Sequence, residues 1–256
     1  MKILEGKEIT VKFGGISAVS AVDLSLTQGE VLSLIGPNGA GKTTLFNVFT
    51  GIYNPEHGDI LLEGQCIRGL KPYQITRRGV ARTFQNIRLF RDMSAVDNCL
   101  VARHSKGQTG LLGALFPLPS AKREERENKN KAMEALQFVG LSDRANEKAR
   151  NLSYGQQRQL EIARALATGA KVLLLDEPAA GMNPQETKEL VNLIAKLQEK
   201  GLTVLLIEHD MRLVMEISDK VAVLDHGKKI AEGQPSDVRR DPEVVRAYLG
   251  GRSAAC

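Results

Sequence analysis

Short apolar runs separated by glycine turns mark the first third of the chain. Three of them, Ile9–Phe13, Val31–Ile35 and Asp59–Leu62, have the apolar, β-prone character of strands. The segment Lys42–Thr50 is compatible with a helix and closes on Gly51, a residue type that commonly follows the last turn of a helix. The pattern therefore predicts a strand, a glycine-rich loop and a helix in that order.

The pattern changes near residue 92 and stays different to about residue 150. Charged, helix-forming stretches such as Ala121–Val139 dominate there and predict a helical insert. The run 110–120 is apolar, but Gly113, Pro117 and Pro119 interrupt it. It predicts a loop or short helix, packed on the protein by default, with contact to a partner as the alternative.

Strands and helices alternate again after residue 170. Val172–Asp176 and Thr203–Ile207 have the composition of buried strands. Between them we expect a helix capped by Asn183, with Pro184 at its first position and Gly201 at its end. Its apolar positions have helical spacing: Leu190, Leu193, Ile194 and Leu197. This alternation predicts a parallel sheet with crossover helices, with the ligand at the carboxyl ends of the strands.

Residues 36–44, GPNGAGKTT, match a phosphate-binding loop at Gly36, Gly41, Lys42 and Thr43. The glycines let backbone N–H groups turn toward a phosphate chain. The lysine can reach the β- and γ-phosphates, and the threonine hydroxyl can ligate Mg²⁺. A glycine turn without a ligand is the alternative, which the flanking strand and helix disfavour. The expected ligand is a nucleoside triphosphate.

Two further segments carry candidate chemistry. Asp176 and Glu177 end a buried strand, where one carboxylate can hold Mg²⁺ and the next can accept a proton from an attacking water. Ser153 and Gly155 precede a helix with an apolar stripe, so they lie at a helix N-terminus, whose free N–H groups favour an anion. Taken alone, the carboxylate segment is explained by a turn after a strand, and the Ser153 segment is explained by a plain N-cap. His209 ends the next strand, and its place beside the carboxylates favours contact with the γ-phosphate over a structural role.

Composition narrows the class of protein. With 35 Lys and Arg against 30 Asp and Glu, the net charge of +5 is too small to indicate nucleic acid binding. Three dispersed cysteines, Cys66, Cys99 and Cys256, indicate reduced thiols rather than disulfides or a zinc site. No run approaches the ~18 apolar residues of a spanning helix, and no secretory signal is apparent. We expect a cytosolic chain with one domain or a domain carrying an insert.

Together these segments resemble the nucleotide-binding subunit of an ATP-binding-cassette (ABC) transporter over essentially the whole chain. Residues of the phosphate loop resemble the family's Walker A segment: Gly36, Pro37, Asn38, Gly39, Ala40, Gly41, Lys42, Thr43 and Thr44. Leu173–Glu177 resembles the Walker B strand, with Glu177 as the catalytic carboxylate, and His209 resembles the switch histidine. Phe13 resembles the aromatic residue that stacks on adenine, although tyrosine is usual there.

The resemblance also assigns a signature segment and a Q-loop. Leu152–Gln156 resembles LSGGQ, which implies that Ser153, Tyr154, Gly155 and Gln156 contact a nucleotide held by a second subunit. Gln85, in ARTFQNIRLF, resembles the Q-loop glutamine that joins Thr43 and Asp176 around Mg²⁺. Two residues depart from the family pattern. Tyr154 stands where glycine is commonest, which should be harmless, and Asn183 stands where many members have aspartate.

The family implies a P-loop NTPase fold of the α/β class, with a RecA-like mixed β/α core, an N-terminal antiparallel β part and an inserted helical subdomain. We expect residues 1–86 and 153–256 to form the catalytic core and residues 87–152 the helical subdomain. Two subunits then enclose ATP head to tail. The surface from Asn86 to Asp92 is expected to contact the membrane subunit, with Arg88 and Arg91 as polar anchors and Gln85 coupling that contact to Mg²⁺.

The segments TFQNIRLF, FPLPSAKREE and AAGMNPQET look most like the bacterial subunit that energises high-affinity import of branched-chain amino acids. That likeness implies ATP and Mg²⁺, a second cassette subunit of the same or a related chain, two membrane permeases and, indirectly, a periplasmic solute-binding protein. The chain would then lie peripherally on the cytoplasmic face of the inner membrane. The alternatives are export of lipid or lipopolysaccharide, a soluble cassette ATPase of translation or DNA maintenance, and a non-enzymatic nucleotide sensor.

Overall fold

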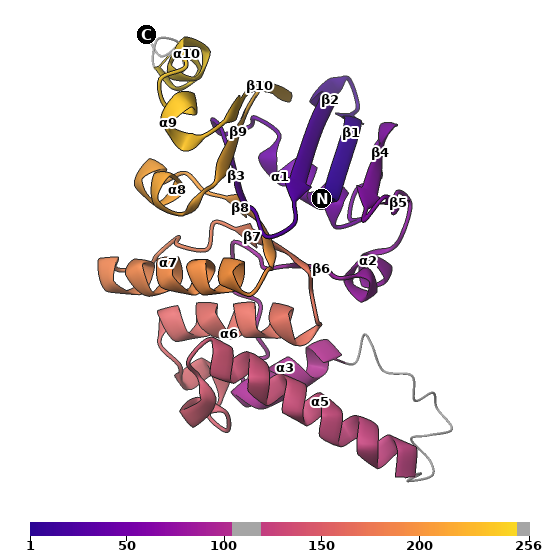
Figure 1. The fold of residues 1–256 in the computed structure, drawn as a ribbon, viewed down its shortest axis with the longest axis vertical. Helices are drawn as coiled ribbons and strands as arrows, with labels where there is room; N and C mark the ends of the chain where they lie inside the picture. The colour runs from indigo at the N-terminus through magenta and orange to yellow at the C-terminus, as the bar shows by residue number, and fades with distance from the viewer. Residues whose placement is uncertain (104–118, 250–256) are drawn as a thin grey trace.

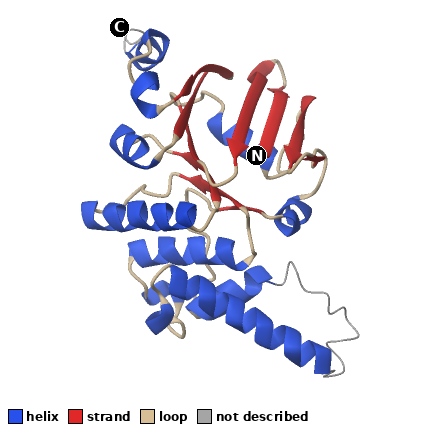
Figure 2. Cartoon of the chain, viewed as in Figure 1, coloured by secondary structure: helices blue, strands red, loops and turns tan. Residues whose placement is uncertain are grey.

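The strands form two β-sheets, one of which has helices on both sides (Figures 1 and 2). The computed structural model describes residues 1–103 and 119–249. The first sheet is antiparallel, with strand order β2-β1-β4-β5. Its strands are β1 (Lys2–Phe13), β2 (Ile16–Thr27), β4 (His57–Leu62) and β5 (Gln65–Cys66).

The second sheet has the order β10-β9-β3-β8-β7-β6, and its pairings are parallel except for β9 with β10. Every residue of β3, β7 and β8 is buried, as expected for strands covered on both faces. The strands are β3 (Val31–Ile35), β6 (Val80–Arg82), β7 (Val172–Asp176), β8 (Thr203–Ile207), β9 (Lys220–Asp225) and β10 (Lys228–Gly233). The carboxyl ends of β3, β7 and β8 therefore meet at one edge.

Figure 1 shows helices on both sides of the six-stranded sheet. α1 lies between the two sheets, whereas α6 and α7 lie below the six-stranded sheet with α3 and α5 beyond α6. Their bounds are α1 (Lys42–Phe49), α2 (Pro72–Arg78), α3 (Ala95–Arg103), α5 (Pro119–Phe138), α6 (Tyr154–Ala167), α7 (Pro184–Glu199), α8 (Met211–Ile217), α9 (Pro235–Val238) and α10 (Pro242–Leu249). Short 3-10 helices span Ser142–Arg144 and Ala149–Asn151.

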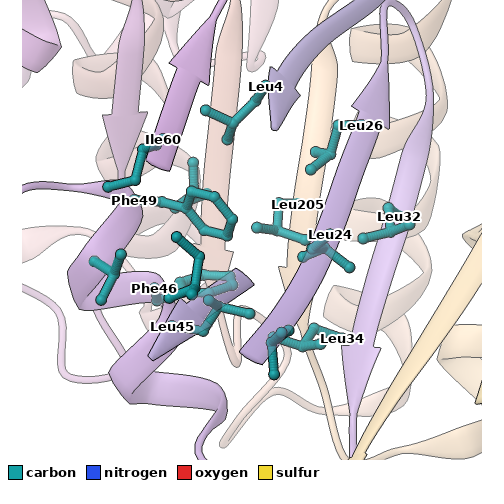
Figure 3. Packing of buried hydrophobic residues seen from close by; sticks show 14 of the residues in the cluster. Leu4, Leu24, Leu26, Leu32, Leu34, Leu45, Phe46, Phe49, Ile60 and Leu205 are labelled. Carbon is teal, nitrogen blue, oxygen red and sulfur yellow. The ribbon is translucent and has the colours of Figure 1, made fainter. Parts of the chain in front are cut away.

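Two large apolar clusters cover the two faces of the parallel strands. Phe46 and Phe49 of α1 pack between the sheets against side chains such as Leu4 and Leu205 (Figure 3). The other cluster joins Leu206 of β8 to α6, α7 and the helices beyond them. The strand that leads into residue 36 is thus packed on both faces, which fixes the position of the loop that follows.

Several sequence predictions of element bounds need correction. β1 begins at Lys2, seven residues before the predicted start, and the long strand β2 was not predicted. Pro119, one of the residues expected to break the apolar run 110–120 into a loop or short helix, is the first residue of the long helix α5, a position where its missing N–H costs nothing. The rest of the apolar run 110–120 lies outside the described residues. The boundary at 87–152 stays a prediction, although every strand named above lies outside that range.

Candidate active site

The phosphate loop joins the end of β3 to the start of α1. Gly36 has φ 145° and Gly41 has φ 101°, both in the left-handed region that favours glycine. A Cβ atom at Gly36 would collide with the carbonyl oxygen of Leu224, and one at Gly41 with that of Ala18. The loop turns tightly because no side chain is present at these two positions. The predicted residues 36–41 form the turn, and Lys42, Thr43 and Thr44 form the first turn of the helix.

The N-terminus of α1 is arranged to receive an anion. Gly41 is its N-cap and has no side chain to cap the first N–H groups. The Lys42 ammonium donates to the carbonyl oxygens of Gly36 (2.7 Å) and Pro37 (2.8 Å). Burial lowers the pKa of Lys42, and the charges of Glu177 and Asp176 oppose that shift. The loop therefore presents a lysine and free N–H groups on the side of the two carboxylates.

The structure brings together three predicted residues from three strand ends. The Gln85 amide nitrogen donates to Glu177 Oε2 at 2.7 Å. His209 Nδ1 lies 3.8 Å from the same oxygen, and the His209 side chain is 69% exposed, so it is free to turn toward a ligand. Glu177 has φ 45°, and its N–H donates to the carbonyl oxygen of Ile207. These groups can orient a water molecule and take a proton from it.

Asp176 has a partner that the sequence reasoning missed. Arg82 at the end of β6 donates to Asp176 Oδ2 at 2.7 Å, and both side chains are less than 10% exposed. The same guanidinium donates to Asn47 Oδ1 at 2.6 Å and lies over the rings of Phe46 and Phe84. The sequence did contain a signal for this pair: Arg82 is a charged residue inside the short apolar stretch that precedes Gln85. A buried arginine requires an acidic partner.

A second buried carboxylate lies behind His209. Glu208 is 1% exposed and accepts from the backbone N–H groups of Ala179 (3.0 Å) and His209 (3.2 Å). Burial raises the pKa of Glu208, while these two N–H groups oppose the shift. Glu208 thus joins the segment after Glu177 to the segment that carries the histidine, and sequence reasoning did not single it out.

The backbone of Gln85 is held by the most completely buried charged side chain of the described chain. Arg158 on α6 is 0% exposed and donates to the carbonyl oxygens of Phe84 (2.7 Å) and Gln85 (2.8 Å). It also forms an ion pair with Glu161 at 2.8 Å. Burial raises the pKa of the Glu161 carboxyl, and the charge of Arg158 opposes that shift. The pair fixes the Q-loop backbone on the helix that begins in the signature segment.

The signature segment forms a complete capping box. Ser153 Oγ accepts from the N–H of Gln156, and the Gln156 side chain accepts from the N–H of Ser153. Ser153 and Gly155 lie at the start of α6 as predicted, and the N–H of Gly155 donates to Glu186 Oε1 at 3.1 Å in this chain. The Tyr154 hydroxyl donates to the carbonyl oxygen of Ala180 at 2.9 Å.

The remaining predicted residues lie around this centre. The Phe13 ring, 47% exposed, contacts Tyr53 edge to face at 5.1 Å between centroids, so it is open to stacking. Arg88 lies over the Phe84 ring at 4.3 Å and lines a groove of about 420 Å³ together with Phe90 and Arg164. Arg91 is exposed but is not among the groove's lining residues.

Two family profiles match parts of this chain. The profile of the family "ABC transporter" matches residues 19–180. The chain belongs to this family. A second profile, "Branched-chain amino acid ATP-binding cassette transporter", matches residues 228–254. The resemblance inferred from the sequence motifs is confirmed, and the chain is an ABC-type ATPase subunit.

Two curated relatives match this ABC subunit along almost its full length. The high-affinity branched-chain amino acid transport ATP-binding protein BraF of Pseudomonas aeruginosa is 52% identical over 97% of this chain and 98% of its own. The protein LivG of Escherichia coli K12, with the same description, is 51% identical over the same shares. The likeness therefore covers the helical insert and the C-terminal helices as well as the phosphate loop.

Solved structures confirm the predicted α/β P-loop NTPase fold of the subunit. The ADP conformation of an ATP-binding cassette of an ABC transporter has a TM-score of 0.85 and 35% identity, covering 98% of this chain and 99% of that one. A dimeric post-hydrolysis cassette bound to ADP and phosphate has a TM-score of 0.74 and 26% identity, over 91% and 99%. Within the residues that the structure describes, no helix is long and apolar enough to cross a membrane.

Proposed function

We propose that this ABC subunit hydrolyses ATP to energise import of branched-chain amino acids through two separate membrane permeases. The observation that carries the proposal is the meeting of Gln85, Glu177 and His209 at the carboxyl edge of the sheet beside Lys42. The names of the relatives and the C-terminal profile support the choice of solute. The subunit would lie peripherally on the cytoplasmic face of the inner membrane, and a periplasmic solute-binding protein would deliver the solute.

Each side chain has a separate task in this proposal. Lys42 and the N–H groups of the loop bind the β- and γ-phosphates, and Phe13 stacks on the adenine. Glu177 accepts the proton of the attacking water, while Gln85 and His209 hold that carboxylate and the γ-phosphate in place. Removing the Glu177 carboxylate should therefore leave ATP binding intact, whereas removing the Lys42 ammonium should not.

The donor set at the strand ends fits Mg²⁺. The Thr43 hydroxyl, the Gln85 amide oxygen and an Asp176 oxygen are hard oxygen ligands of the kind this ion prefers. Gln85 uses its nitrogen toward Glu177, and Asp176 uses Oδ2 toward Arg82, so each keeps an oxygen for the ion. Bound there with ATP, Mg²⁺ would neutralise charge on the phosphates.

The complete site requires a second cassette subunit, either the same chain or a related one. In the proposed head-to-tail dimer the phosphate loop of one chain faces Ser153, Tyr154, Gly155 and Gln156 of the other, and they enclose one ATP. The dimeric cassette among the similar structures supports this arrangement. The N–H of Gly155 would have to leave Glu186 to reach the phosphate, which makes this contact a feature of the separated chain.

The groove beside Arg88 is the proposed permease contact. It lies between the Q-loop and α6, and Phe84 and Phe90 give it an apolar floor while Arg88 and Arg164 give it positive charge. An amphipathic helix with an acidic residue would fit. Arg91, outside the groove's lining, would contribute at its margin. A cysteine at Arg88 should crosslink to a cytoplasmic permease helix in an ATP-dependent way, more efficiently than one at Arg91.

The decisive experiment compares two variants in the assembled transporter. Glu177→Gln should bind ATP, accumulate a closed dimer and hydrolyse ATP at least 100-fold more slowly, in the range attributed to general acid–base catalysis, about 10²–10⁴-fold. Lys42→Ala should lose most ATP binding. Hydrolysis by Glu177→Gln near the wild-type rate would show that the base is assigned wrongly. Leucine uptake that is unchanged on deleting the chain, with lipid export impaired, would favour the export alternative.

A further inference from the structure

Tyr154 connects two segments that the proposed function assigns to different nucleotides. Its hydroxyl, at the start of α6, donates to the carbonyl oxygen of Ala180 at 2.9 Å. Ala180 lies three residues after Glu177, and its own N–H donates to the Glu177 carbonyl oxygen at 3.1 Å. The tyrosine therefore holds the turn that directly follows the proposed catalytic carboxylate.

The turn is shaped around this side chain. Gly181 has φ 79°, and a Cβ atom there would lie 3.3 Å from the Tyr154 hydroxyl and 3.4 Å from its ring. Glycine adopts this backbone conformation without strain, and a Cβ atom there would press on the ring by a few tenths of an ångström. Arg158, which holds the Gln85 carbonyl, lies 3.5 Å from the same hydroxyl and so supports Tyr154 from the other side.

A second bridge joins the same two segments. Glu186, in the first turn of α7, accepts the N–H of Gly155 with Oε1 and the N–H of Asn183 with Oε2, both at 3.1 Å. A Cβ atom at Gly155 would lie 2.7 Å from Glu186 Oε1. Two contacts therefore join the signature segment to residues 180–186 in the separated chain.

The backbone of Glu177 needs support of this kind. Its φ of 45° is unfavourable for a residue with a side chain and persists only where the surroundings impose it. On one side, its N–H is fixed to the carbonyl oxygen of Ile207. On the other side, the turn at Ala180 is fixed by Tyr154. Loss of the tyrosine hydroxyl removes one of these two restraints.

We propose that Tyr154 is a positioning residue for ATP hydrolysis: it fixes Glu177 through the turn at Ala180. It thereby couples the chain's signature segment, which serves the partner's ATP, to the carboxylate that serves the chain's own ATP. The coupling rests on the proposed head-to-tail dimer, whereas the positioning role rests on the single chain alone.

Hydrogen exchange in the full chain tests the positioning role without a dimer. Tyr154→Phe keeps the ring and removes the hydroxyl, and the amides of residues 179–183 should then exchange about three- to tenfold faster, as expected for the loss of one hydrogen bond. Tyr73→Phe, at an exposed tyrosine of α2, is the matched control and should leave that segment unchanged. Equal exchange in Tyr154→Phe and wild type would overturn the proposal.

A fused dimer of two copies tests the consequence for catalysis. With Lys42→Ala in one copy, a single phosphate loop remains active. Adding Tyr154→Phe to the copy that keeps Lys42 should lower kcat about three- to tenfold with little change in KM for ATP, and by more than the same change in the other copy. A larger fall in kcat when Tyr154→Phe is in the copy that carries Lys42→Ala would mean that Tyr154 acts on the partner's nucleotide. That result would overturn the proposal.

The same dimer separates this inference from the proposed function. Ser153→Arg should impair hydrolysis more in the copy that carries Lys42→Ala, since that copy supplies the signature segment to the working loop. If the two placements of Ser153→Arg are equivalent, the head-to-tail site fails, while the exchange measurement still decides whether Tyr154 positions the turn. If Tyr154→Phe leaves hydrogen exchange unchanged but the two placements of Ser153→Arg differ in activity, the head-to-tail dimer is supported and the positioning role of Tyr154 is rejected.

Discussion

Replacing Arg82 by methionine tests whether the buried pair with Asp176 stabilises the fold. The change removes the 2.7 Å bond to Asp176 and the 2.6 Å bond to Asn47, and it keeps an apolar chain between the rings of Phe46 and Phe84. Asp176 is left in a site where it is 6% exposed. The result should be a marked loss of stability rather than a local change at the surface.

The size of the loss follows from the surroundings of Asp176. Breaking a buried ion pair by removing one partner costs about 3–5 kcal/mol, because the other charge stays buried. The ammonium of Lys42 also interacts with Asp176, so the carboxylate does not lose every nearby cation. The methionine side chain recovers part of the packing. We therefore expect the low end of the range, about 3 kcal/mol.

Urea unfolding followed by circular dichroism measures this loss in a chain that contains no tryptophan. The matched control is Arg150→Met, which breaks the exposed pair with Asp92 and should cost less than about 1 kcal/mol. In a double-mutant cycle with Asp176→Asn, the two changes should be non-additive by at least about 1 kcal/mol. A cost below about 1 kcal/mol for Arg82→Met, or strict additivity, would refute the argument.

Three other predictions follow from buried groups. Burial raises the pKa of Glu208 above its ordinary 4.5, so the folded state holds this proton more tightly and stability falls as pH rises above that value. The unfolding free energy of Glu208→Gln should fall less with rising pH, and an unchanged pH profile would contradict this. In a Cys256→Ser background the exposed Cys66 should react quickly with a thiol reagent, whereas Cys99, buried and with a pKa of about 12, should react only on unfolding. Phe49→Ala should lower the unfolding free energy by about 3–5 kcal/mol in urea titration, and a loss under about 1 kcal/mol would show that the cluster in Figure 3 collapses around the gap.

Sequence signals correctly predicted the features that depend on contacts between residues close together in the chain. Asn183 is an N-cap in the structure, accepting from the N–H of Glu186, because a capping bond joins residues three apart. Val31–Ile35 and Val172–Asp176 have the predicted bounds, since a continuous apolar run is what a strand covered on both faces requires. The phosphate loop between its strand and helix was predictable for the same reason.

Long-range contacts and irregular strands escaped prediction. β2 was missed because its register against β1 shifts several times, with Glu8 and Ala21 at positive φ, so its apolar positions do not alternate regularly. The Arg82–Asp176 pair joins residues 94 apart, and its partners lie on neighbouring strands that only the sheet order brings together. The hydrogen bond from the Gly155 N–H to Glu186 likewise depends on how α6 packs against α7.

The two adjacent carboxylates at the end of β7 differ in how their charges are balanced. Asp176 is buried and paired with Arg82 at 2.7 Å, so its charge is already compensated within the chain. Glu177 is held by the neutral amide of Gln85, and in the described part of the chain only His209 lies within ion-pair distance of it, at 3.8 Å. The Arg82 guanidinium supplies a full positive charge to Asp176, whereas the Gln85 amide supplies only a hydrogen-bond donor to Glu177. On this difference we propose that Asp176 keeps its fixed pair while Glu177 meets the attacking water, although the two residues are neighbours in sequence.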